Sequence, residues 1–180
     1  MTSVAGSSRM RGKDNSMKTT AAFIFLCGLA TIGLGQARQP SAPSAPFYIK
    51  SHSQIDEITK ELEKQKGNQN RDIFPAKGAQ MRVAVFHDEK RENDLYELHD
   101  NSDDIYYVLD GEATLALGGE LAEPNEISPG EWRSKTVKGG NPFEIKKGDL
   151  IVVPRGTVHQ RTATGKGFSM ILIKVFAAKQ

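Results

Sequence analysis

The chain has 180 residues, which suits one domain, and its 24 basic and 22 acidic residues give a net charge of +2. The basic excess lies at the N-terminus: without residues 1–37 the net charge is −1, which argues against a nucleic-acid partner. Cys27 is the single cysteine and lies in the same segment, so residues 38–180 have no thiol for a disulfide, a nucleophile or a metal ligand.

Residues 17–37 have the arrangement of a secretory signal peptide. Met17 and Lys18 precede an apolar run from Ala21 to Leu34, which ends in Gly-Gln-Ala. The run is shorter than the roughly 20 residues that span a bilayer. We therefore expect a leader over 1–37 with its signal peptide at Met17–Ala37, a secreted or periplasmic mature chain, and no membrane anchor after cleavage.

The segment that follows the leader is expected to precede the main domain. Residues 38–46 are rich in Pro, Ser and Ala, which predicts a flexible linker. Residues 47–78 are expected to hold a short strand at 47–50 and an amphipathic helix at 54–64, with Ser53 and Asp56 resembling a capping box. The charged residues of this helix are expected to face solvent.

Residues 79–180 contain many short β-prone runs separated by Gly, Pro and polar turns, which predicts an all-β barrel or sandwich. Asp110-Gly111 predicts a hairpin turn. The charged run 87–94 is expected to be a loop in which His87, like the surface residue His52, is not a ligand. The segment 119–141 is long for a simple connection, and its Trp132 is expected to fix this loop to the barrel. The expected strands are 80–86, 95–99, 105–109, 112–117, 143–145, 149–154, 157–162 and 168–176.

Two stretches within this region resemble the motifs of the cupin superfamily. In the second motif, Gly148, Pro154, Gly156 and His159 are all in register. In the first motif, the positions of three ligands are held by Glu97, His99 and Asp104, followed by Gly111.

The chain departs from the family pattern at four positions. Glu97 replaces the first His and Asp104 replaces the Glu. Arg91 replaces the leading Gly, and Ala163 replaces the final Asn. The resemblance covers roughly residues 80 to 176, and it implies a double-stranded β-helix, or jelly-roll barrel, preceded by a short helical segment.

The resemblance also implies a metal site formed by Glu97, His99, Asp104 and His159. Alternation along a strand places Glu97 and His99 on one face. Imidazoles and carboxylates suit a divalent ion such as Fe, Mn, Zn or Ni without choosing among them. The expected function is metal-dependent chemistry on a small organic substrate, of dioxygenase, isomerase or lyase type, with Glu97 as general base if it is free of the metal.

Two other interpretations remain open. The same four side chains can form a carboxylate–imidazole network without metal, in a module that only binds a small molecule such as a sugar or phenolic compound. A third possibility is a structural or sensory module. Small cupins commonly pair through their sheets, so we also expect a homodimer, with the strand around Phe47 as the contact.

Overall fold

The computed structural model describes residues 40–43, 46–74 and 80–178. The predicted signal peptide lies outside these residues, as do residues 38–39 and 44–45 of the predicted linker. Within the described part of the chain, no helix has the length and hydrophobicity needed to span a bilayer.

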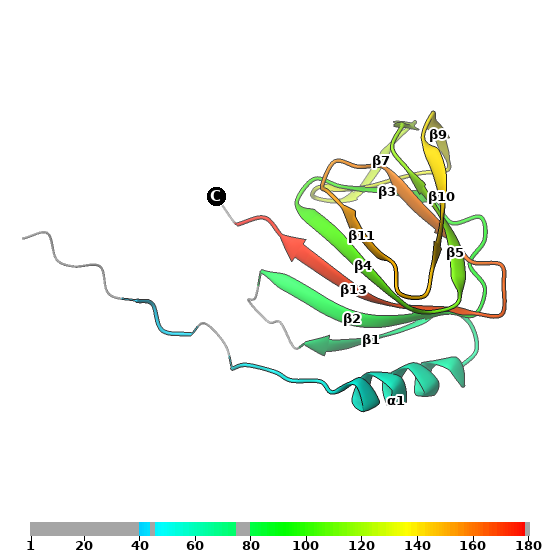
Figure 1. The fold of residues 1–180 in the computed structure, drawn as a ribbon. Helices are drawn as coiled ribbons and strands as arrows, with labels where there is room; N and C mark the ends of the chain where they lie inside the picture. Colours follow the sequence, from blue (N-terminus) through cyan, green and yellow to red (C-terminus); the bar gives the residue numbers. More distant parts are fainter. Residues whose placement is uncertain (1–39, 44–45, 75–79, 179–180) are drawn as a thin grey trace, which may run out of the picture. The chain divides into compact units, whose positions relative to one another are not determined.

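The predicted all-β fold is confirmed (Figure 1), with a single helix among the described residues. The elements are α1 (His52–Glu63), β1 (Gln69–Phe74), β2 (Met81–Asp88), β3 (Tyr96–His99), β4 (Ser102–Asp110), β5 (Glu112–Leu117), β6 (Glu120–Ala122), β7 (Asn125–Ser128), β8 (Glu131–Ser134), β9 (Thr136–Lys138), β10 (Asn141–Lys146), β11 (Leu150–Val153), β12 (His159–Thr162) and β13 (Phe168–Phe176).

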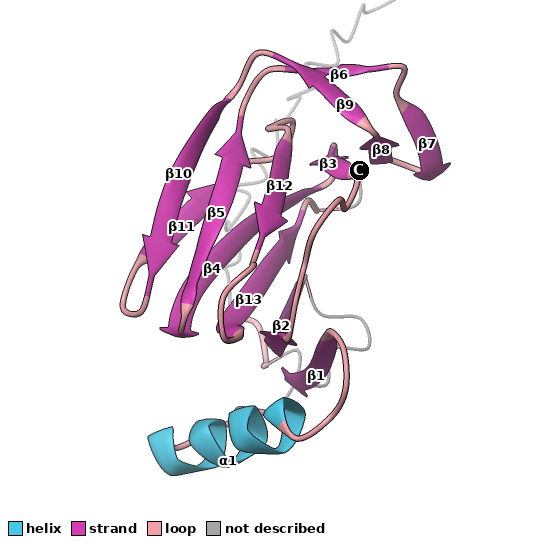
Figure 2. Ribbon diagram, turned by 90° about the vertical axis from the view of Figure 1, so that its right-hand side faces the viewer, coloured by secondary structure: helices cyan, strands magenta, loops and turns pink. Residues whose placement is uncertain are grey.

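Two antiparallel sheets form the barrel. The first has the strand order β1-β2-β13-β4-β11, and the second has the order β10-β5-β12-β3-β8-β7. Figure 2 shows the two sheets from the side, with α1 beside β1 and β2. From β2 to β5 and again from β10 to β13, successive strands alternate between these two sheets, which is the arrangement of a double-stranded β-helix, while β6 and β9 form a separate two-stranded sheet. The fold class predicted from the sequence is therefore confirmed.

The period of two along the strands determines what lies inside the barrel. On β4, Asp104, Tyr106 and Val108 are buried, while Tyr107 between them faces outward. Apolar side chains fill the rest of the interior as one buried cluster. This core comprises Tyr106, Val108, Ala113, Leu115, Ile145, Val153, Ala163, Phe168, Met170 and Leu172.

The turn at Asp110-Gly111 is confirmed, but the predicted hairpin is wrong. Strands β4 and β5 belong to different sheets and do not pair with each other. Gly111 has φ 80°, and a Cβ at this position would lie 2.2 Å from the carbonyl oxygen of Gly167. The glycine is therefore required because the chain crosses between the sheets close to another backbone segment.

The N-terminal segment corrects two predictions. Residues 47–50 form no strand: the side chain of Phe47 is 89% exposed, and only the ring of Tyr48 packs, edge-on, against Phe74. The capping box consists of Ser51 and Gln54 instead of Ser53 and Asp56. The longer side chain of Gln54 accounts for the shift, because its carbonyl oxygen reaches the Ser51 amide at 2.9 Å.

The predicted loop 87–94 begins too early, because β2 continues to Asp88. His87 is a buried strand residue whose Nδ1 lies 2.9 Å from Ser169 Oγ on β13. The charge of Asp88 concealed the continuation of the strand. Its carboxylate is fully buried between Arg91 and Arg161, with contacts of 3.0 Å and 2.8 Å. Residues 119–141 are likewise not a simple loop, since they form β6 to β9.

Candidate metal site

Three of the four predicted ligand residues converge inside the barrel. Glu97 and His99 lie on β3 and His159 begins β12, where it is the register partner of Glu97. Potential ligand atoms of these three residues all lie within 4.8 Å of one another. The His99 side chain is 5% exposed and that of Glu97 is 35% exposed. A buried nitrogen pair therefore meets a carboxylate that solvent can reach.

The turn at Arg155-Gly156, in the second motif, holds His159 close to His99. The amide of Gly156 donates to the carbonyl oxygen of His99 at 2.8 Å, which ties the turn to the end of β3. Arg155 in the same turn donates from its backbone amide and its guanidinium to Asp103 on β4. The rings of His99 and His159 lie with their centroids 5.0 Å apart.

Hydrogen bonds at the other ring nitrogen aim both imidazoles toward one point. Nδ1 of His99 lies 2.6 Å from the Glu131 carboxylate, and Nδ1 of His159 lies 3.0 Å from the Thr157 carbonyl oxygen. Both partners are acceptors, so each Nδ1 carries the proton and each Nε2 presents its lone pair. Both Nε2 atoms are buried and have no hydrogen-bond partner among the described residues. Burial lowers the pKa of His159, which favours its neutral, ligating form.

The donor set fits a divalent cation. Two neutral imidazole nitrogens and one carboxylate suit Zn, Fe, Mn or Ni. Glu97 Oε2 lies 3.6 Å from His99 Nε2 and 4.0 Å from His159 Nε2. The two unpartnered buried nitrogens give this fit its physical basis, because buried polar atoms normally have a partner.

Asp104, the fourth predicted ligand, lies beside the cluster but already has a cationic partner. Its Oδ2 lies 3.5 Å from His99 Nε2 and 3.8 Å from His159 Nε2. Its Oδ1 lies 2.6 Å from Lys174 Nζ on β13. Burial alone would raise the pKa of Asp104, but the contact with His99 and the charge of Lys174 outweigh it and lower the pKa to about 2. The role of Asp104 as a ligand stays a prediction.

The structure adds three charged residues that sequence reasoning did not single out. Glu131 and Arg133 lie on β8, and Lys174 lies on the inner face of β13. The Arg133 guanidinium lies 3.4 Å from Glu97 and 3.5 Å from Glu131. Only the alternation of Lys174 with Leu172 and Met170 along β13 signalled that a cation would face inward.

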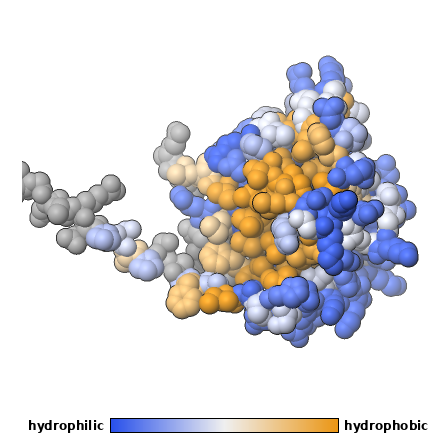
Figure 3. Space-filling view, viewed as in Figure 1, coloured by the Kyte–Doolittle hydropathy of each residue, from blue (hydrophilic) through white to orange (hydrophobic). Residues whose placement is uncertain are grey.

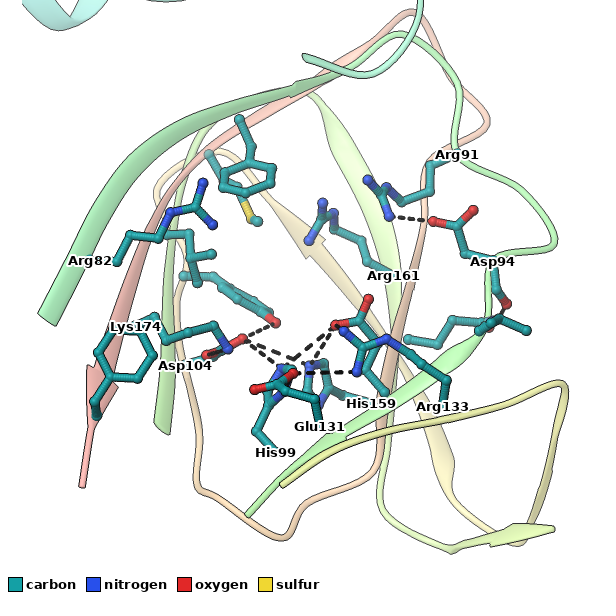
Figure 4. Close-up of a pocket in the computed structure, with 18 residues that line it drawn as sticks. Arg82, Arg91, Asp94, His99, Asp104, Glu131, Arg133, His159, Arg161 and Lys174 are labelled. Atoms are coloured by element: carbon teal, nitrogen blue, oxygen red, sulfur yellow. Dashed lines mark hydrogen bonds and ion pairs between the residues drawn. The ribbon is translucent and has the colours of Figure 1, made fainter. Parts of the chain in front are cut away.

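Figure 4 shows the cluster at one side of a cavity of about 380 Å³. Phe86, Met170 and Leu172 contribute apolar walls, and Arg82 and Arg161 reach the cavity from β2 and β12. The cavity therefore combines a candidate metal site with apolar and cationic surface, as small-molecule sites do.

Trp132 lies on β8, outside this cavity. Its indole Nε1 donates to Asp100 at 2.7 Å, next to the end of β3. It also lines a separate groove with Leu98, Leu121 and Val158. The hydrogen bond agrees with the predicted role of Trp132 in fixing segment 119–141 to the barrel.

No family model and no curated protein matches the chain. Among solved structures, a double-stranded β-helix protein from Klebsiella pneumoniae is 18% identical, with a TM-score of 0.47, covering 74% of this chain and 100% of that one. KdgF from a Halomonas species is 17% identical, with a TM-score of 0.43 and coverages of 64% and 85%. A putative sugar phosphate isomerase from Acidithiobacillus ferrooxidans is 16% identical, with a TM-score of 0.45 and coverages of 71% and 74%. Similarity at this level assigns neither a substrate nor a reaction to the chain.

Proposed function

We propose that the protein binds one divalent metal ion through Glu97, His99 and His159 and uses it on a small organic substrate held in the barrel. The observation that carries this proposal is the convergence of two buried, unpartnered Nε2 atoms beside a carboxylate. The reaction classes that fit are those of a dioxygenase, an isomerase or a lyase.

The bound metal would act as a Lewis acid with coordination positions open to substrate or solvent. The chain's own residues prepare the site around it. Glu131 holds His99 in the tautomer that leaves Nε2 free, and Thr157 does the same for His159. Arg133 faces Glu97 and Glu131, where it offsets one of the two negative charges. Glu97 is the proposed general base only in a state in which it does not bind the metal.

A second candidate function is binding of a small molecule without metal. The contacts of the carboxylates favour it: Lys174 pairs with Asp104, and Arg133 lies beside Glu97, so both acids have a cation from the chain itself. In this state the imidazoles would hydrogen-bond to the ligand instead of a metal. A sugar or phenolic compound has the hydroxyl groups that this requires.

Metal analysis of the purified protein separates the two candidates. The metal-site proposal predicts about one divalent ion per chain, which His159→Ala removes. His52→Ala is the matched control, because His52 lies on the exposed face of α1. Oxygen uptake with candidate substrates then separates a dioxygenase from an isomerase or lyase. A chain that stays free of metal after incubation with Zn²⁺, Fe²⁺, Mn²⁺ and Ni²⁺ would contradict the proposal.

Export is a further part of the proposal and rests on the pattern of Met17–Ala37. The mature protein is expected to begin at Arg38, in the periplasm or outside the cell. The intact mass of exported protein tests this expectation, and a mature chain that still contains Cys27 would contradict it.

We also propose a homodimer, through a different surface from the one expected. No strand forms around Phe47, so that segment offers no sheet edge. Figure 3 shows apolar side chains gathered over the outer face of the first sheet, where Tyr107, Leu150 and Val152 are exposed. Contiguous apolar surface of this kind is typical of protein interfaces. Light scattering of the Val152→Lys variant should show a monomer if this face forms the contact, and an unchanged mass would exclude it.

A further inference from the structure

The side of the cavity opposite the histidines is lined by guanidinium groups. Figure 4 shows Arg82, Arg91 and Arg161 there, separated from His99 and His159 by open space. We propose that this side binds the anionic group of a small organic acid or phosphate ester, while the other end of that molecule faces the Glu97–His99–His159 cluster. This inference rests on the proposed function and defines the class of its substrate.

Arg161 is held rigidly with one amino group left over. Its Nε and Nη2 each lie 2.8 Å from Asp88, whose side chain is fully buried. Its guanidinium carbon lies 5.9 Å from the centre of the Tyr106 ring and 5.7 Å from that of Phe168. Nη1 has no acceptor within the described part of the chain. A planar donor fixed by a carboxylate and two rings is preorganised for an oxyanion.

Arg82 approaches the cavity from the neighbouring sheet in the same manner. Its Nε donates to Asp72 at 2.8 Å and its Nη2 to Asn70 at 3.0 Å, both on β1. Its guanidinium carbon lies 5.6 Å from the centre of the Phe86 ring. Here too Nη1 lacks an acceptor among residues 40–43, 46–74 and 80–178. The two arginines therefore present free N–H groups to one cavity from β2 and β12.

The charge balance of the cavity supports an anion once a metal is present. The lining includes five cationic side chains: Arg82, Arg91, Arg133, Arg161 and Lys174. The acids of the lining, together with those that pair with these cations, are Asp72, Asp88, Asp94, Glu97, Asp104 and Glu131. One negative charge is thus in excess without metal, and one positive charge is in excess with a divalent ion. A monoanion neutralises the loaded cavity.

The apolar walls set the remaining chemistry of the ligand. Phe86, Met170 and Leu172 lie on β2 and β13 beside the arginines. The C–H groups of a short carbon chain can pack on them, while its oxygen atoms meet the polar groups at the two ends of the cavity. The cavity of about 380 Å³ suits a compound of roughly the size of a six-carbon sugar acid.

Calorimetry with three matched probes tests the inference: gluconate, sorbitol 6-phosphate and neutral sorbitol. Each is titrated into Zn²⁺-incubated and metal-free protein after excess metal has been removed. At least one anion should bind at least about tenfold more tightly than sorbitol, because charge-assisted hydrogen bonds are stronger than neutral ones. The two anions separate a carboxylate from a phosphate preference. Equal affinity for all three probes, or no binding of either anion, would overturn the inference.

Substitutions show whether the arginines create the preference. Arg82→Gln and Arg161→Gln should each reduce anion affinity about tenfold or more and leave sorbitol affinity unchanged. Arg71→Gln is the matched control, because Arg71 pairs with Glu61 away from the cavity. Arg82→Gln is informative even if Arg161→Gln unfolds, since Arg82 does not contact the buried Asp88. An anion preference that survives in Arg82→Gln and in every folded Arg161 variant would refute the assignment.

Metal content measured on the same samples separates the two proposals. Bound metal without an anion preference would refute this inference and leave the proposed function standing. An anion preference that depends on the arginines in protein that takes up no metal would support the guanidinium site and refute the metal function.

Discussion

Glu131→Gln gives the sharpest test of how the chain prepares its metal site. The carboxylate of Glu131 lies 2.6 Å from His99 Nδ1, in a pocket where the His99 side chain is almost fully buried. Glutamine keeps the length and an acceptor oxygen but removes the negative charge, which lowers the basicity of Nε2. Loss of such a partner typically reduces metal affinity tenfold to a hundredfold, which corresponds to about 1.4 to 2.8 kcal/mol.

The measurement is Zn²⁺ affinity by competition with a chelator, accompanied by thermal unfolding of each variant. Glu144→Gln is the matched control. Glu144 lies on β10, where its exposed carboxylate accepts a hydrogen bond from Thr114 of β5. An unchanged Zn²⁺ affinity in folded Glu131→Gln would refute the reasoning, since it would show that His99 needs no charged partner. An equal loss of Zn²⁺ affinity in the control Glu144→Gln would refute the reasoning as well.

Three further predictions concern the ligands themselves. His159→Ala should abolish metal binding while the circular dichroism spectrum stays that of the folded barrel, and retained binding would remove His159 from the ligand set. Burial lowers the pKa of His159, so Zn²⁺ affinity should persist below the ordinary imidazole pKa of 6.5 and fall only at more acid pH; constant affinity through the acid range would contradict this. Asp104→Glu should hold or raise metal affinity if Asp104 is a ligand. If the four side chains instead form a metal-free network, the added methylene should lower the free energy of unfolding by about 1–3 kcal/mol, as measured by denaturant titration without metal.

Much of the fold was predictable because its signals are local. The strand predicted at 168–176 coincides with β13, where all residues except Ser169 and Lys174 are apolar. The histidines were predictable because His99 alternates correctly on β3 and His159 follows a turn specified by Gly156. In contrast, β1 is a polar edge strand, with Gln, Asn, Arg and Asp among its six residues, and no hydrophobic period marks it.

The partners of the site were not predictable for a different reason. Glu131 contacts His99 from the adjacent strand, and its segment lacks the alternation that would have placed it on β8 beforehand. Asp88 gave a misleading signal, since Asp is depleted in strands. It is tolerated in β2 because two guanidinium groups neutralise it, a compensation that only the assembled barrel reveals.

Lys174 bears most directly on how many metal ligands the chain can provide. Asp104 is one methylene shorter than the glutamate of the cupin motif that this stretch resembles, and the Lys174 ammonium group lies 2.6 Å from its Oδ1. The other oxygen, Oδ2, accepts a hydrogen bond from Tyr106 at 3.3 Å and lies 3.5 Å from His99 Nε2, so a metal ion would have to compete with two partners for this buried carboxylate. In the proposed metal-bound state, Glu97, His99 and His159 therefore suffice without Asp104. A site with two His and one carboxylate keeps several positions open. Those positions are what a substrate with oxygen atoms at one end and an anionic group near Arg161 requires. An Asp104 side chain that keeps its contact with Lys174 in the metal-bound state would therefore also leave room for the ligand.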